Sequence, residues 1–316
     1  MEAPRVSHVE VGEDDGGMRL DRWLRQQFPG VPFGVLSRIV RTGQVRVDGA
    51  RAKLETRLEP GQSVRLPPVT VADAPAPPRA EGDAAALEAM VIHRDSALVV
   101  LNKPYGLAVQ GGSGLTRHID GMLEAWRDRN GRKPRLVHRL DRETTGVLVV
   151  ALKRSAAAFL AEQFRGRDAH KDYWALTRGH PSPEEGKIST WLARDPHDGE
   201  KMAVVRTKTK DAQRAITTWE TLDRAGQLSL LRLSPITGRT HQLRVHCAHM
   251  GVPIIGDTKY FNVENWALPG GIQNRLHLHA RHISLPHPDG GTLEVTAPLS
   301  PHFQQSLSVL GLDPDG

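Results

Sequence analysis

Residues 135–154 read RLVHRLDRETTGVLVVALKR. The first half of this stretch is polar, and its single aspartate, Asp141, stands between Arg139 and Arg142. The second half contains the apolar run 147–152, which predicts a short buried strand. A carboxylate placed among guanidinium groups at the mouth of a buried strand is either a surface ion pair or a functional group. The rest of the sequence decides between these two interpretations.

The strand after Asp141 belongs to a series of similar segments. Alternating or wholly apolar runs predict strands at 91–92, 97–101, 147–152, 172–178, 215–220, 227–234, 280–285 and 292–296. Helical spacing of apolar residues predicts helices only at 118–129 and 155–165. Many strands with few intervening helices predict an α+β fold, built on a mixed, largely antiparallel sheet with flanking helices.

Residues 17–66 predict a small αβ module in front of this domain. Apolar residues at helical spacing predict helices at 20–28 and 35–40, and the Asp-Gly pair at 48–49 predicts a two-residue hairpin. Ten basic side chains but only four acidic ones lie between residues 19 and 65. A compact basic module of this kind indicates a surface that binds a polyanion.

The cysteine content and the hydropathy of the chain indicate its cellular compartment, and shifts in composition indicate its domain boundaries. The single cysteine, Cys247, excludes an internal disulfide framework and suits a reducing compartment. No apolar run is long enough for a membrane helix, and the acidic N-terminus does not resemble a secretory signal. We therefore expect a cytoplasmic protein that has no membrane as a partner. We also expect it to be a monomer. The predicted segments are a flexible N-terminus (1–16), the basic module (17–66), a Pro/Ala-rich linker (67–87), the large domain (88–302) and a C-terminal tail (303–316).

Three polar stretches of the large domain could carry chemistry. They are HRLDRETTG (138–146), HKDYWAL (170–176) and PITGRTHQLRVH (235–246). The sequence contains neither a phosphate-binding glycine loop nor a C-x-x-C pair. His241, His246 and His249 do not match a standard zinc spacing, so we expect no metal site.

These stretches together resemble one family. HRLDRETTG is similar to the HRLDxxTSG motif of the RluA-type pseudouridine synthases, with Thr145 in place of the commoner serine. KDYWAL resembles the tyrosine motif of that family, TGRTHQLRVH its arginine motif, and NKPYGL the opening of its catalytic domain. MRLDRWLR and LSRIVRTGQVRVDG resemble the S4-like RNA-binding domain, so the resemblance spans the whole chain. GLAVQGGSGL and HKDYWALTRG resemble the branch that modifies large-subunit ribosomal RNA.

The resemblance implies a role for each matching residue. Asp141 corresponds to the catalytic aspartate, which either attacks C1′ of a flipped-out uridine or removes a sugar proton. Arg244 corresponds to the arginine that pairs with it, Tyr173 to the tyrosine that stacks on the base, and Arg139 to the arginine that enters the space left by the nucleotide. The resemblance implies no metal, nucleotide or redox cofactor, and a partner that is large-subunit ribosomal RNA or a pre-ribosomal particle. Further RNA-binding candidates are His138, Arg239, Lys103, Arg22, Arg38, Arg41 and Arg46.

Two other functions remain open from the residues. One is an RNA-binding or ribosome-assembly factor without catalysis, but such a protein has no need for Asp141, Tyr173 and Arg244 together. The other is a hydrolase, which needs a second carboxylate across the scissile bond. Glu143 and Asp257 are the candidates for that carboxylate.

Overall fold

The computed structural model describes residues 6–28, 31, 33–68, 80–111, 117–129, 131–166, 168–261 and 266–313. Its internal contacts divide the chain into two units, residues 1–78 and 79–316. Within the described ranges, no helix is both long and apolar enough to cross a membrane.

The N-terminal unit packs two helices on a four-stranded sheet. The sheet order is β1-β4-β2-β3. Its two-residue hairpin turns at Asp48 (φ 49°) and Gly49 (φ 79°), as the sequence predicts. The flexible segment predicted for 1–16 is wrong from Ser7 onward, because β1 pairs with β4 along its whole length. The elements are β1 (Ser7–Glu10), a 3-10 turn (Glu13–Asp15), α1 (Leu20–Gln27), α2 (Phe33–Arg41), β2 (Arg46–Val47), β3 (Ala50–Arg51) and β4 (Ser63–Leu66).

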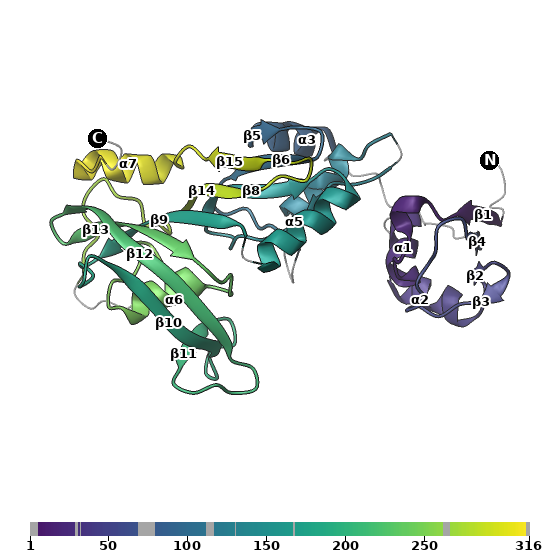
Figure 1. The fold of residues 1–316 in the computed structure, drawn as a ribbon, viewed down its shortest axis with the longest axis horizontal. Coiled ribbons are helices and arrows are strands. Elements are labelled where there is room, and N and C mark those ends of the chain that lie inside the picture. The colour runs from purple at the N-terminus through teal and green to yellow at the C-terminus, as the bar shows by residue number, and fades with distance from the viewer. Residues whose placement is uncertain are drawn as a thin grey trace. The chain divides into compact units, whose positions relative to one another are not determined.

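The C-terminal unit is built on one eleven-stranded sheet, seen in Figure 1. The order of its main path is β11-β10-β12-β13-β9-β14-β8-β6-β5, with β15 paired to β14 and β7 paired to β8. Among the strand pairs of the described residues, only β14–β8 is parallel, so the prediction of a mixed, largely antiparallel sheet is confirmed. The strands are β5 (Val91–Arg94), β6 (Leu98–Lys103), β7 (Arg135–Leu136), β8 (Thr145–Ala151), β9 (His170–Arg178), β10 (Glu185–Arg194), β11 (Met202–Val205), β12 (Gln213–Ala225), β13 (Leu228–Pro235), β14 (Leu278–Pro286) and β15 (Thr292–Thr296).

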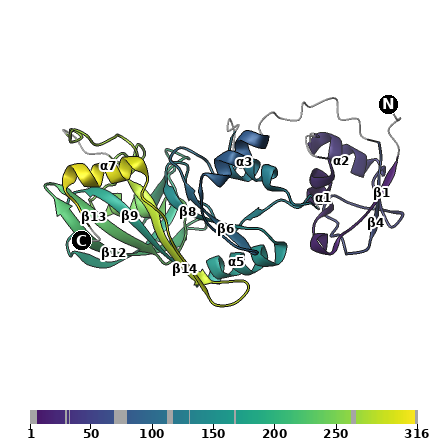
Figure 2. The same cartoon turned by 90° about the horizontal axis from the view of Figure 1, so that it is seen from above.

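Helices cover both faces of this sheet. Figure 2 shows α3 and α5 on opposite sides of β6 and β8. Along β9, Ala175 packs with α6, whereas Trp174 and Leu176 pack with α7 on the other face. The helices are α3 (Ala80–Glu88), α4 (Ile119–Met122), the 3-10 helix η2 (Leu123–Trp126), α5 (Arg154–Gly166), α6 (Gln242–His249) and α7 (Pro301–Leu310).

Two predicted segments at the edges of the large domain need correction. The linker predicted for 67–87 is too long, because α3 starts at Ala80 and buries Leu87 in the core beside β6 and β8. The tail predicted for 303–316 begins inside α7, which runs to Leu310 and whose Phe303 is fully buried. The sequence of α3 has too few apolar residues to predict a helix by their spacing. In α7, the polar residues between Phe303 and Leu307 interrupt the apolar pattern.

Candidate active site

Asp141 lies on the loop between β7 and β8, and His138 holds the start of this loop. The backbone N–H of Val149 in β8 donates to Nε2 of His138 at 2.8 Å, where the short strand β7 has ended. The ring also stacks on Phe164 of α5, with 4.4 Å between centroids. Burial lowers the pKa of His138 to about 3, which suits a nitrogen that accepts a hydrogen bond. His138 thus anchors the loop, and its contact with RNA stays a prediction.

Lys103 holds the other side of the same loop. Its side chain is fully buried, and its Nζ donates to the carbonyl oxygens of Pro104, Leu107 and Arg142 at 3.0, 2.8 and 3.0 Å. Burial lowers the pKa of Lys103 to about 7, while the charge of Asp141 raises it. Three acceptors match the three N–H bonds of an ammonium group, so this geometry selects the charged form. A side chain with no exposed surface cannot contact RNA, and the predicted RNA contact of Lys103 is corrected accordingly.

The register of the sheet brings the tyrosine motif to this loop. His279 of β14 pairs with Thr145 of β8 on one side and with Trp174 of β9 on the other. Gly146 is required here, because a Cβ at this position would lie 2.2 Å from the carbonyl oxygen of Ala280. Tyr173 is thereby placed beside the loop that carries Asp141.

The arginine motif forms the start of α6. The buried amide of Gln242 accepts from the Thr237 hydroxyl at 2.7 Å and from the Arg239 N–H at 3.0 Å, and it donates to Thr217 and to the Ile216 carbonyl. This amide fixes the loop before the helix. The next turn then points Arg244 toward Asp141.

Arg244 lies among three carboxylates. Its Nε and Nη2 donate to Asp257 at 2.8 and 2.7 Å, and its Nη1 lies 3.9 Å from Oδ2 of Asp141. Nη2 also lies 3.5 Å from Glu143. Burial opposes the charge of Arg244, but its hydrogen bonds with Asp257 and the nearby carboxylates give a raised pKa. The expected pairing of Arg244 with Asp141 is thus present as a longer contact, and the bidentate partner is Asp257.

These motifs line one cavity of about 130 Å³. Asp141 lies on its wall with a 20% exposed side chain, and Arg139 and Arg239 lie at its exposed rim. Burial and the charge of Asp141 raise the pKa of Tyr173, which is therefore a neutral phenol. The site thus combines one carboxylate, one buried cation and one aromatic ring.

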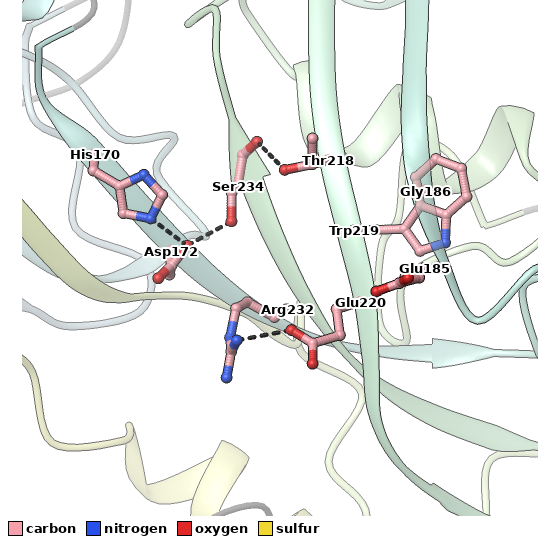
Figure 3. A pocket seen from close by; sticks show the side chains of 9 residues that line it. All are labelled: His170, Asp172, Glu185, Gly186, Thr218, Trp219, Glu220, Arg232 and Ser234. Carbon is pink, nitrogen blue, oxygen red and sulfur yellow. Dashed lines mark hydrogen bonds and ion pairs between the residues drawn. The ribbon is translucent and has the colours of Figure 1, made fainter.

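A larger hollow of about 500 Å³ lies on the other face of the sheet (Figure 3). Asp172 lines it, and successive strand residues point to opposite faces, so it opens away from Tyr173. Several of its polar groups already have partners: the Ser234 hydroxyl donates to Asp172, which also contacts His170 at 3.2 Å, and Arg232 pairs with Glu220 at 2.7 Å. Glu185, the register partner of Glu220, also lines this hollow.

The predicted basic residues of the N-terminal unit lie on its surface. Exposed side chains are found for all four of them, namely Arg22, Arg38, Arg41 and Arg46. Arg46 donates to the carbonyl of Gly49 at 2.9 Å. Within the described part of the chain, none of the four forms an ion pair with a carboxylate, so their charge is available to a ligand.

The histidines of the arginine motif do not gather around a metal position. His246 lies between the hydroxyls of Thr190 and Thr217, each at 2.9 Å. His241 bonds to Tyr260 through Nδ1 at 2.7 Å, and its Nε2 lies 3.9 Å from Asp141. No group of histidine, cysteine and acidic side chains among the described residues is arranged to hold a metal ion.

Comparison with known proteins decides the family. The chain is 40% identical over 311 residues to ribosomal large subunit pseudouridine synthase C of Vibrio cholerae, covering 96% of both chains. It is 39% identical to the protein of that name from Escherichia coli, covering 98% of both. The chain belongs to the RluA family of pseudouridine synthases. It is therefore an RNA pseudouridine synthase, an isomerase.

Two further comparisons agree with this assignment. The RNA pseudouridylate synthase family model matches residues 97–249, which include all three motifs of the site. Human RNA pseudouridylate synthase domain containing 4 superimposes with a TM-score of 0.62 at 34% identity, covering 74% of this chain and 97% of that one. The predicted fold class is thereby confirmed. The membership in an enzyme family argues against a non-catalytic factor. Asp257 does not suit the second carboxylate of a hydrolase, since it is fully buried with both oxygens bound to Arg244.

The sequence did not reveal two residues of the site. The sequence suggested Asp257 only as a candidate second carboxylate of a hydrolase, and His241 only as a possible metal ligand. The signal for Asp257 is the preceding Gly256, which has a φ of 73° and where an added Cβ would lie 1.9 Å from the carbonyl oxygen of Arg275. His241 has no comparable local signal, because its contact with Asp141 spans a hundred residues of sequence.

Proposed function

We propose that this enzyme converts uridines of large-subunit ribosomal RNA to pseudouridine, with Asp141 as its catalytic carboxylate. The observation that carries the proposal is the position of Asp141 on a cavity wall shared with Tyr173 and Arg244. The named relatives are ribosomal large subunit pseudouridine synthases at about full length, which supports the choice of RNA. The enzyme would act in the cytoplasm, and as a monomer because one chain supplies every residue of the site.

The reaction sets the demands on the site. The bond between N1 and C1′ breaks, C1′ joins C5, the C5 proton leaves and N1 gains a proton. An ionised Asp141 can start this by attacking C1′ or by removing a proton from the sugar. Arg244, 98% buried and 3.9 Å away, supplies a fixed positive charge next to the carboxylate. Both routes use the same geometry, and no cofactor takes part in either.

Tyr173 and Arg139 would hold the extruded nucleotide. The raised pKa of Tyr173 makes its phenol a poor base, so stacking on the uracil is the role its position favours over removal of the C5 proton. Arg139 is exposed at the rim, where its guanidinium can fill the gap left in the RNA. Extruding a base costs a few kcal/mol, and filling the gap offsets part of that cost.

The N-terminal unit would act as an S4-like RNA-binding domain. Two features support this: the order helix, helix, hairpin, and four exposed arginines that form no ion pair with a carboxylate among the described residues. These arginines are Arg22, Arg38, Arg41 and Arg46. Such side chains contact phosphates and add salt-dependent affinity. Arg239, exposed beside the cavity, would add a further phosphate contact.

Pseudouridine mapping of ribosomal RNA tests this proposal. Cells lacking the gene should lose specific pseudouridines in the large-subunit RNA, and the wild-type gene but not its Asp141→Asn form should restore them. Incubating the purified enzyme with protein-free RNA and with precursor particles then shows which of the two is the substrate. An unchanged map after gene removal would refute the choice of ribosomal RNA.

A further inference from the structure

His241 occupies an unusual backbone position next to the catalytic carboxylate. Its φ is 53°, and among the described residues only Asp48, in a hairpin turn, shares a positive φ without being glycine. Strained backbone of this kind persists where the surroundings require it, and it gathers at functional sites. The imidazole is held in the wall of the cavity with 12% of its side chain exposed.

The hydrogen-bond partners of the His241 ring show which of its two nitrogens carries the proton. The N–H of Met202 donates to the Tyr260 oxygen at 2.8 Å, and that oxygen lies 2.7 Å from Nδ1 of His241. The structure gives the Tyr260 hydroxyl no other acceptor in the described residues, so its O–H donates to Nδ1. A neutral imidazole that accepts at Nδ1 carries its proton on Nε2. This proton faces Oδ2 of Asp141, 3.9 Å from Nε2.

Two donors therefore converge on one oxygen of Asp141. Nε2 of His241 and Nη1 of Arg244 both lie 3.9 Å from Oδ2. Among the described residues, no side-chain hydrogen bond to Oδ1 is found, so the two donors that the structure places nearest to the carboxylate both lie on the Oδ2 side. A carboxylate held by one oxygen presents the other in a fixed direction, which is the requirement for a nucleophile or base.

We propose that His241 is a positioning residue, which together with Tyr260 orients Asp141 by its Nε2–H so that the opposite carboxylate oxygen meets the ribose. The proposal rests on the catalytic role given to Asp141. It requires His241 to be neutral, and burial does lower its pKa, while the charge of Asp141 raises it. The charged and titratable groups that face the imidazole are Asp141, Arg244, Lys259, Asp257 and Tyr260.

His241→Gly is the variant that tests this, because glycine adopts a positive φ without strain and the fold should be retained. We expect kcat to fall by about 10- to 100-fold at a nearly unchanged KM, because the carboxylate of Asp141 is then no longer held in its reactive orientation. Added imidazole should restore part of the rate by occupying the vacated space. The control is His249→Ala, an exposed histidine of the same helix, which should keep the wild-type rate and ignore imidazole.

Tyr260→Phe provides a second readout, since it keeps the ring over Arg244 but removes the hydroxyl that fixes the tautomer. Without that donor, Nδ1 takes up a proton more readily. The resulting imidazolium cation then pairs with the carboxylate of Asp141 and offsets its negative charge. The acid limb of the pH–rate profile should therefore move to higher pH. A wild-type kcat and no imidazole effect for His241→Gly, with Asp141→Asn inactive, would overturn this proposal and leave the role of Asp141 intact. Activity in Asp141→Asn would instead overturn the proposed function.

Discussion

Arg244 donates two hydrogen bonds to Asp257, at 2.8 and 2.7 Å, and holds its third nitrogen 3.9 Å from Asp141. The bidentate pair locks the guanidinium plane, because all of its atoms are then fixed by one carboxylate. The free edge of the guanidinium points at Oδ2 of Asp141. Asp257 thus holds the positively charged guanidinium of Arg244 in place beside Asp141.

Removing Asp257 should damage both stability and catalysis. Asp257→Ala leaves the buried guanidinium of Arg244 without its main partner, and breaking such a pair costs about 3–5 kcal/mol. Denaturant unfolding should show this loss, and the folded fraction should have a lower kcat. The control is Glu220→Ala, which breaks the exposed pair with Arg232 and should cost about 1 kcal/mol or less. Equal stability losses in the two variants would contradict the proposed support role.

Lys103→Met should loosen the loop that carries Asp141. Methionine has a similar length but cannot donate, so the carbonyls of Pro104 and Leu107 lose the donor that Lys103 supplies. An unsatisfied buried polar group costs about 1–3 kcal/mol. We expect a lower free energy of unfolding, and a fall in kcat larger than any change in KM. Lys153→Met, at an exposed site, is the matched substitution and should change neither quantity.

Buried neutral histidines should make the enzyme sensitive to acid. Burial lowers the pKa of His246, His277 and His279 to about 4, against 6.5 for an unperturbed side chain. Below pH 6.5 the unfolded chain binds protons that the folded chain does not, so stability falls as the pH falls toward 4. Each such histidine contributes up to about 1.4 kcal/mol per pH unit. Chemical denaturation between pH 7 and 5 measures the slope.

His277→Gln isolates one of these contributions. This variant has no proton to take up, so its slope of stability against pH should be shallower than that of the wild type. Carboxylates titrate equally in both proteins and cancel in the difference. Identical slopes would show that His277 is not held neutral in the folded enzyme.

The four exposed arginines of the N-terminal unit should set the salt dependence of RNA binding. If each neutralises one phosphate, replacing Arg22, Arg38, Arg41 and Arg46 by alanine should reduce the slope of log affinity against log salt by about 3, at ~0.7 for each single-strand contact. The single-turnover rate at saturating RNA should stay unchanged. Replacing Arg94 and Arg224, which are paired with Glu88 and Glu184, serves as the comparison and should leave the slope nearly unaltered.

The sequence was informative where a local pattern has a direct physical consequence. The apolar runs around β8 and β9 predict strands because their side chains alternate or are wholly buried, and Asp141 and Tyr173 could be assigned from the motifs beside them. The direction of a long polar side chain depends instead on tertiary packing. Lys103 was therefore taken as an RNA contact, although the fold turns it inward onto three backbone carbonyls. The pair of Arg244 with Asp257 likewise depends on tertiary packing, and the glycine at 256 was its one local signal.

Single-turnover pseudouridine formation by Asp141→Asn tests the central claim most directly. Asparagine keeps the shape of the side chain and its place between His241 and Arg244, but it can act neither as nucleophile nor as base. We predict RNA affinity equal to that of the wild type and no pseudouridine, measured on the same RNA preparation. Pseudouridine formation at the wild-type rate would contradict the account.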